Sequence, residues 1–306
     1  MAATQAPLDL LVGIDGGGSK TLLRLAAPDL SVLAEARGGP ANIARDPDGA
    51  ARSIEAALEE AVGRAGLAGA PVRLFVGAGL AGALVPGAMD RLRAAWTDRR
   101  VSAVDLHSDA YATCLGAHDG GDGAVLAVGT GSVGFAINGG LTFRVGGWGF
   151  PQGDEGGGAW LGLEAVRTVL RLRDARAKAS DAGALARSIE AFGEQMEGGL
   201  PGWASRASAA EFATLVPEIL RAAEGGDSLG ARLLRAAAAE VALLAVALPA
   251  CLPCCLLGGL GPSLQPLLPA DLQQRLVPAQ GDAGHGALLM ASACYRGAEA
   301  VPIEPP

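Results

Sequence analysis

The sequence is poor in the residue types that mark secreted, membrane and nucleic-acid-binding proteins. Its five cysteines are an odd number in apolar surroundings, which argues against a disulfide framework and favours reduced thiols in the cytoplasm. The 24 Lys and Arg residues are outnumbered by 32 Asp and Glu residues, so we expect no basic surface for nucleic acids or anionic membranes. These shortages favour a small-molecule partner.

The chain also lacks an uninterrupted apolar run long enough to cross a membrane. Residues 241–270 carry no charge, but prolines and glycines between Pro249 and Pro262 interrupt them before a helix of about 20 apolar residues could form. We predict a helix end, a core strand and a glycine turn there. Residues 1–7 contain no basic residue and no signal-type segment follows them, so we expect no export.

What the sequence does contain is a glycine-rich turn between two short apolar runs at residues 10–25. The first run ends in Asp15, and Gly16, Gly17, Gly18, Ser19 and Lys20 follow. Glycine N–H groups can approach an anion closely, because no Cβ is in the way. Asp15 would repel a bare phosphate, but Mg²⁺ binds carboxylate and phosphate oxygens together. The pattern predicts a nucleotide-phosphate loop with a metal anchor.

Two commoner phosphate motifs do not fit this turn. A Walker loop needs Gly-Lys-Ser/Thr, whereas Ser19 separates Gly18 from Lys20. A dinucleotide fingerprint opens a helix, whereas residues 22–25 are typical of a strand. A glycine-rich hairpin without a ligand remains the alternative.

The opening pattern occurs a second time about one domain later. An apolar strand at 124–128 leads into the turn at 129–132, and a hairpin follows at 135–145. With 306 residues, the chain is long enough for two domains. We predict an N-terminal domain at 1–118, joined by the helix at about 286–306, and a larger domain at 119–285 with a helical insertion at about 180–224. Two similar domains would bring their turns to either side of one cleft.

Two further residues have both a functional and a structural interpretation. Asp109 ends a predicted strand and precedes a short helix, so it is either a helix cap or a general base. Trp148 lies in a long glycine-rich loop, where it is either an apolar wall for a sugar ring or a core residue.

Six motifs, taken in order and spacing over nearly the whole chain, resemble those of one family. They are IDGGGSKT (14–21), SDA (108–110), GTGS (129–132), GGWG (146–149), GDEG (153–156) and LGG (257–259). The chain resembles the N-acetylglucosamine and glucosamine kinase group of the BadF/BadG/BcrA/BcrD ATPase-like family, in the actin, Hsp70 and sugar-kinase superfamily. The resemblance implies an α/β fold with two ribonuclease-H-like (actin-like ATPase) domains facing a central cleft.

The resemblance also implies ATP and Mg²⁺ as cofactors, Asp15 at the metal and Asp109 as the catalytic base. It assigns ATP binding to Gly16, Gly17, Gly18, Ser19, Lys20, Thr130, Gly131, Ser132, Gly258 and Gly259. It assigns amino-sugar binding to Asn42, Asp109, Gly146, Gly147 and Asp154. At 79–82 this chain has only Gly, Leu and Ala, whereas vertebrate members carry a serine.

The function expected on this basis is ATP-dependent phosphorylation of the 6-hydroxyl of N-acetylglucosamine, with glucosamine as the alternative acceptor. An iron–sulfur activator ATPase is a rival suggested only by Cys251, Cys254 and Cys255. A sugar-responsive regulator would need a DNA-binding module and a basic surface, for which we expect no room. The oligomeric state is left open, a homodimer included, as is the choice between Asp154 and Glu155 for the sugar contact.

Overall fold

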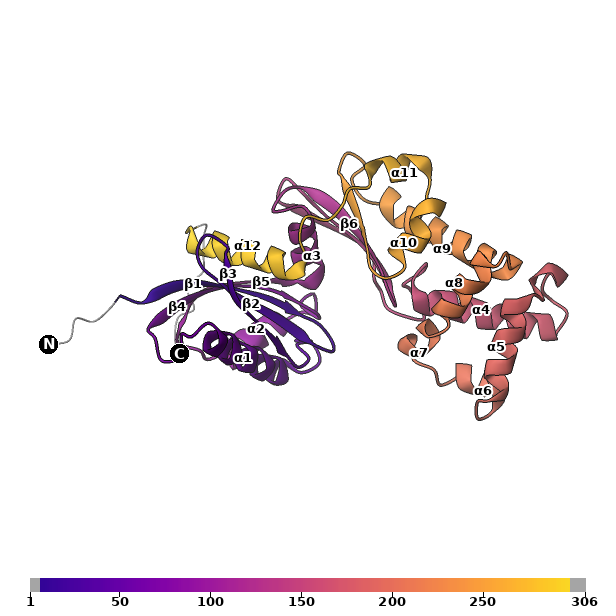
Figure 1. Ribbon diagram of the computed structural model, residues 1–306, viewed down its shortest axis with the longest axis horizontal. Helices are drawn as coiled ribbons and strands as arrows, with labels where there is room; N and C mark the ends of the chain where they lie inside the picture. Colours follow the sequence, from indigo (N-terminus) through magenta and orange to yellow (C-terminus); the bar gives the residue numbers. More distant parts are fainter. Residues whose placement is uncertain (1–5, 298–306) are drawn as a thin grey trace. The chain divides into compact units, whose positions relative to one another are not determined.

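The computed structural model describes residues 6–297, and the chain divides into two compact units (Figure 1). Unit 1 combines residues up to Gly123 with those from Ala279 onward. Unit 2 consists of residues 124–278. The chain therefore leaves unit 1, builds unit 2 and returns to complete unit 1.

Unit 1 is built on a five-stranded sheet in the order β3-β2-β1-β4-β5. Its strands are β1 (Leu8–Gly16), β2 (Thr21–Ala26), β3 (Val32–Gly38), β4 (Val72–Leu80) and β5 (Val101–Ser108). Short turns make β1, β2 and β3 antiparallel, and helical crossovers make β4 and β5 parallel to β1. The glycine turn therefore joins two neighbouring antiparallel strands, as predicted.

Helices cover both faces of this sheet (Figure 1). One face carries α1 (Pro47–Arg64) and α2 (Ala88–Ala95), and the other carries α3 (Asp109–Ala117) and α12 (Ala283–Tyr295). The face of α1 that carries Ile54, Leu58 and Val62, at a spacing of four residues, is buried.

Three glycines let α12 and α3 approach the sheet closely. A Cβ at Gly13 would lie 2.8 Å from the carbonyl oxygen of Gly284, and one at Gly77 would lie 2.6 Å from the backbone nitrogen of Ala291. A Cβ at Gly79 would contact the Cα of Asp109 at 3.5 Å. These glycines alternate along two adjacent strands, so they open one face of the sheet to both helices.

Unit 2 has a four-stranded sheet in the order β8-β7-β6-β9. Its strands are β6 (Gly123–Val128), β7 (Ser132–Asn138), β8 (Leu141–Gly146) and β9 (Cys254–Leu257). This order matches that of β3-β2-β1-β4 in unit 1, which confirms that the opening strand-turn-strand pattern occurs twice. Together with the two sheets, it confirms the predicted mixed α/β fold of the ribonuclease-H-like type.

The helices of unit 2 include the predicted lobe at about 180–224. They are α4 (Gly158–Arg173), α5 (Ala184–Glu194), α6 (Gly199–Ala204), α7 (Ala209–Ala213), α8 (Val216–Glu224), α9 (Ser228–Val246), α10 (Gly261–Leu264) and α11 (Ala270–Arg275), with short 3₁₀ helices at Ala179–Asp181 and Gln265–Leu267. In the lobe, the ring centroid of Trp203 lies 5.0 Å from those of Phe192 and Phe212. An aromatic cluster thus forms its core.

The uncharged stretch at 241–270 has the elements predicted for it. Just after it, Leu276 forms an isolated bridge with Cys254 of β9. Residues 241–270 contain the end of α9, the short strand β9 and a glycine turn, as predicted. Within the described residues 6–297, no helix is long and apolar enough to span a membrane.

The close packing of α12 predicts opposite effects of one substitution at two glycines. Gly77→Ala should lower the free energy of unfolding by about 1–3 kcal/mol, because the new methyl group meets α12 backbone. Gly63→Ala in α1 should raise it by about 0.5–1 kcal/mol, because the site has open space and alanine favours helix. Urea unfolding followed by circular dichroism measures both. Equal effects would contradict the packing argument.

Candidate functional site

The glycine turn of unit 1 is held on its inner side and open on its outer side. The backbone N–H of Gly17 donates to Lys20 (2.9 Å), and the Ala41 N–H donates to the carbonyl oxygen of Gly17 (2.9 Å). The outer residues Gly18, Ser19 and Lys20 are exposed. In the described part of the chain, no group accepts a hydrogen bond from the backbone N–H of Gly18 or Ser19. The turn therefore presents free donors, as a phosphate loop requires.

Asp15 lies at the end of β1, directly before this turn. Its carboxylate is half-buried, and no described residue donates a hydrogen bond to it. Burial raises the pKa of Asp15, the carboxylates of Asp109 and Asp282 raise it further, and Lys20 and Arg24 act in the opposite direction. An unpaired carboxylate among other carboxylates favours a cation as its partner.

Asp109 is not the cap of the helix that it begins. The hydroxyl of Ser108 caps α3 by accepting from the Tyr111 N–H at 3.2 Å. Asp109 is the first helical residue, and among the described residues its Oδ1 accepts only from the adjacent Ala110 N–H, at 2.9 Å. Its side chain is exposed on the side of the sheet that Gly79 opens. The capping interpretation therefore belongs to Ser108, and the Asp109 carboxylate is available for another task.

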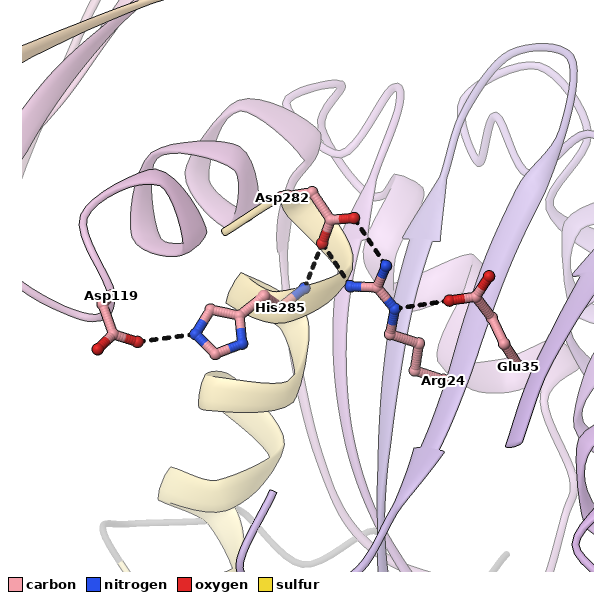
Figure 2. A network of polar contacts seen from close by, with 5 residues as sticks. All are labelled: Arg24, Glu35, Asp119, Asp282 and His285. Atoms are coloured by element: carbon pink, nitrogen blue, oxygen red, sulfur yellow. Dashed lines mark hydrogen bonds and ion pairs between the residues drawn. The ribbon is translucent and has the colours of Figure 1, made fainter. Parts of the chain in front are cut away.

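A charged network beside these carboxylates was missed by the sequence analysis (Figure 2). Arg24 on β2 donates to both oxygens of Asp282, at 2.5 and 2.7 Å, and through Nε to Glu35 at 2.9 Å. Asp282 also caps α12 by accepting from the His285 N–H at 2.9 Å. Its hydrogen bonds with Arg24 hold the pKa of Asp282 below its usual value. The sequence contained one indication of this network, which is that Arg24 is a charged residue within the otherwise apolar strand TLLRLA.

The donor set fits a magnesium ion that arrives with a nucleotide. Among the residues that the structure describes, no three His, Cys, Asp or Glu side chains lie close enough to hold a metal by themselves. Mg²⁺ commonly takes one or two carboxylates and completes its shell with phosphate oxygens and waters. Asp15 beside an open phosphate turn meets that requirement.

The burial of two of the three cysteines disfavours an iron–sulfur site. Cys254 and Cys255 are buried, and Cys251 is exposed. Burial raises the pKa of Cys254 to about 12, which disfavours the thiolate that a cluster requires. These side chains belong to the core strand β9 and its approach.

The side-chain oxygen of Asn42 is held by the backbone, and its side-chain NH₂ group has no partner among the described residues. Its Oδ1 accepts from the Ala44 N–H at 3.2 Å and the Arg45 N–H at 3.1 Å. No acceptor for its Nδ2 lies in the described residues, so this group is available to a ligand. Asn42 and Gly18 line one groove of about 590 Å³. In unit 1 the glycine turn therefore borders a concave surface that carries a hydrogen-bond donor.

The second turn, at 129–132, is bound to the start of α4. The N–H groups of Gly158 and Ala159 donate to the carbonyl oxygens of Gly129 and Thr130, at 2.8 and 2.9 Å. The hydroxyl of Ser132 is buried and donates to the carbonyl oxygen of Glu155 at 2.6 Å. Ser132 thus supports the turn from inside, and this leaves Thr130 and Gly131 as its outer residues.

Asp154 links this turn to the glycine-rich loop. It has a φ of 62°, and its Oδ1 accepts from the Gly149 N–H at 3.1 Å. Its carboxylate fills the space that a Cβ on Gly131 would occupy. Gly146 and Gly147 have φ values of 69° and 66°, which allow the loop to turn back at the end of β8. The structure therefore brings Asp154 together with Gly131 and Gly149, and Gly146 and Gly147 lie on the same loop as Gly149.

Trp148 and the turn at 258–259 complete unit 2. Trp148 is 72% exposed, so its core interpretation is wrong. The Arg144 guanidinium carbon lies 5.1 Å from its ring centroid.

Gly258 has a φ of 92°, and a Cβ there would overlap the backbone of Val128. This turn therefore lies directly beside the end of β6, where Gly129 begins the second glycine turn.

Comparisons with known proteins agree with these motifs. A model of the BadF/BadG/BcrA/BcrD ATPase family matches residues 12–259. The glucosamine kinase GspK of Vibrio cholerae is 32% identical over 292 residues, which cover 93% of this chain and 96% of that protein. An N-acetylmuramic acid/N-acetylglucosamine kinase of Clostridium acetobutylicum is 30% identical over 175 residues, or 54% of this chain and 55% of that protein.

Solved structures show the same architecture. A Chromobacterium violaceum protein provisionally named an N-acetylglucosamine kinase has 36% identity and a TM-score of 0.81, over 93% of this chain and 99% of that chain. A Porphyromonas gingivalis protein with the same provisional name has 15% identity and a TM-score of 0.64, over 94% of this chain and 100% of that chain, so it supports the fold alone.

The environment of Asp15 predicts a specific loss of magnesium-assisted nucleotide binding. We define the magnesium ratio as the dissociation constant of ADP in excess EDTA divided by that in saturating Mg²⁺. Asp15→Asn should lower this ratio about 10-fold or more, because the amide carries no charge to hold the cation. Isothermal titration calorimetry measures both constants.

Asp9→Asn is the matched control, because Asp9 lies on the same strand but at its other end and pairs with Arg73. Its magnesium ratio should equal that of the parent. An unchanged ratio in folded Asp15→Asn protein would remove the metal role from Asp15.

Proposed function

Because the chain belongs to the BadF/BadG/BcrA/BcrD ATPase family, we propose that it is an ATP-dependent kinase that phosphorylates an amino sugar. The observation that carries this proposal is the exposed carboxylate of Asp109, which is free of the capping role and lies on the face of the sheet that also carries Asp15. Phosphoryl transfer needs little more than a phosphate cradle, a cation and a carboxylate for the acceptor hydroxyl.

In the proposed reaction, Asp109 orients the 6-hydroxyl of the sugar and accepts its proton. The hydroxyl oxygen forms a bond to the γ-phosphorus of ATP as the bond between that phosphorus and the bridging oxygen of ADP breaks. The N–H groups of Gly18 and Ser19 bind phosphate oxygens, and Asn42 Nδ2 donates to a sugar oxygen. Magnesium, held through Asp15, supplies positive charge to the phosphates.

The residues of unit 2 take the remaining parts of the ligands in this proposal. Thr130 and Gly131 bind phosphate oxygens through their backbone, and Gly258 and Gly259 border the adenosine. Gly146, Gly147 and Asp154 bind the amino sugar through the loop that Asp154 holds to the second glycine turn.

We propose N-acetylglucosamine as the acceptor, with glucosamine as the second candidate. The full-length similarity to a protein named glucosamine kinase supports the second candidate. So does the segment at 79–82, which offers no side-chain hydroxyl or amide to an acetyl group. An ADP-release assay across N-acetylglucosamine, glucosamine, glucose and N-acetylmannosamine separates them. No sugar-dependent ADP release would refute the proposed function.

Asp109→Asn should show whether Asp109 acts as the catalytic base or has only a structural role. The amide keeps the shape of the side chain but cannot accept the proton, so kcat should fall about 10²- to 10⁴-fold while ATP binding stays near parental. The melting temperature should change little, because Ser108 keeps the cap. Sugar-dependent ADP release and a melting curve measure the two quantities.

Ser108→Ala is the converse variant. Loss of the capping hydroxyl should cost about 1 kcal/mol of stability, with a much smaller loss of kcat than in Asp109→Asn. Near-parental turnover in folded Asp109→Asn protein would remove the base assignment.

A further inference from the structure

Three carboxylates and one guanidinium lie on the same face of the unit 1 sheet, near its carboxyl end. Gly13 and Asp15 are two residues apart on β1, so both point to the face on which α12 packs. Arg24 is the cross-strand partner of Gly13 and shares this face. Asp282 begins α12, and Asp109 begins α3 on the same side.

Arg24 is a cation within this group, and besides Asp282 it bonds the carboxylate of Glu35 at 2.9 Å. Its side chain is only 19% exposed, and it bonds both oxygens of Asp282 (Figure 2). One step of two residues along a strand is about 7 Å, so the Arg24 position lies within about one Debye length of Asp15. Charges at this separation and depth act on one another with little screening.

We propose that Arg24 and Asp282 form a positioning pair whose opposite charges set the strength of magnesium–nucleotide binding at Asp15. This inference rests on the proposed role of Asp15 as the metal anchor. Neither residue needs to contact the ion. The pair holds the start of α12 beside Asp15 and keeps the Asp282 carboxylate neutralised, so that its negative charge does not add to those of Asp15 and Asp109 near the cation.

If the pair acts through its charges, removing the positive and the negative member should change the magnesium ratio in opposite directions. A purely structural link would not show this difference. Arg24→Gln leaves the Asp282 carboxylate unbalanced, which should raise the magnesium ratio about threefold to tenfold. Asp282→Asn removes one carboxylate and leaves Arg24 paired with Glu35 alone, which should lower the ratio by a similar factor. Both variants break the two Arg24–Asp282 hydrogen bonds, and Arg24→Gln also loses the bond to Glu35. Loss of a structural link would change the ratio in one direction or not at all, whereas the two charge changes have opposite signs.

Three further variants sharpen the test. The double variant Arg24→Gln/Asp282→Asn restores the net charge, and Arg24→Lys keeps it, so both should return the ratio close to parental. Arg73→Gln is the matched control, because Arg73 holds Asp9 in the same bidentate way, at 2.6 and 2.7 Å. Asp9 is about 20 Å along β1 from Asp15, so this variant should leave the ratio unchanged.

The same calorimetric titrations of ADP with Mg²⁺ and with EDTA decide the outcome, and melting temperatures report folding. Opposite shifts for Arg24→Gln and Asp282→Asn, and recovery in the double variant, support the pair. Shifts of the same sign, or unchanged ratios in folded variants, overturn it. A parental protein that binds MgADP but phosphorylates no amino sugar would contradict the proposed acceptor alone, since the titrations use no sugar.

Discussion

Close backbone packing on one face of the unit 1 sheet is the constraint on which the candidate site depends. Gly13, Gly77 and Gly79 have no side chain there, and this lets α12 and α3 lie against β1 and β4. Because both helices begin near the carboxyl end of those strands, their first residues, Asp109 and Asp282, come to the edge where Asp15 stands. The lack of a Cβ at these three glycines therefore allows the three carboxylates to lie at one edge of the sheet.

The parts of this arrangement that could be predicted are those with a local cause. A carboxylate before three glycines indicates a phosphate turn, because neighbouring residues determine the geometry of a tight turn. The second glycine turn, between an apolar strand and a hairpin, predicted the repeat of the fold. Phosphate binding, inferred from the glycine pattern, and the roles of individual residues, inferred from the family resemblance, remain predictions.

The parts that could not be predicted depend on residues far apart in the chain. Arg24 and Asp282 are 258 positions apart, and no periodicity connects a strand residue with the cap of a helix at that distance. Trp148 illustrates the other difficulty, since a tryptophan between glycines is compatible with burial or with exposure until the path of the loop is known. Ser108 and Asp109 were ambiguous for a similar reason, because either side chain could cap α3.

The return of the chain to unit 1 has a consequence for synthesis on the ribosome. Leu11 and Phe75 are buried in a cluster with Leu288 and Ala291 of α12. These apolar strands are therefore made before the helix that covers them, with all of unit 2 translated in between. At about 5–20 residues per second, α12 is made roughly ten seconds or more after the strands that it covers, and until then Leu11 and Phe75 lack the helix that buries them.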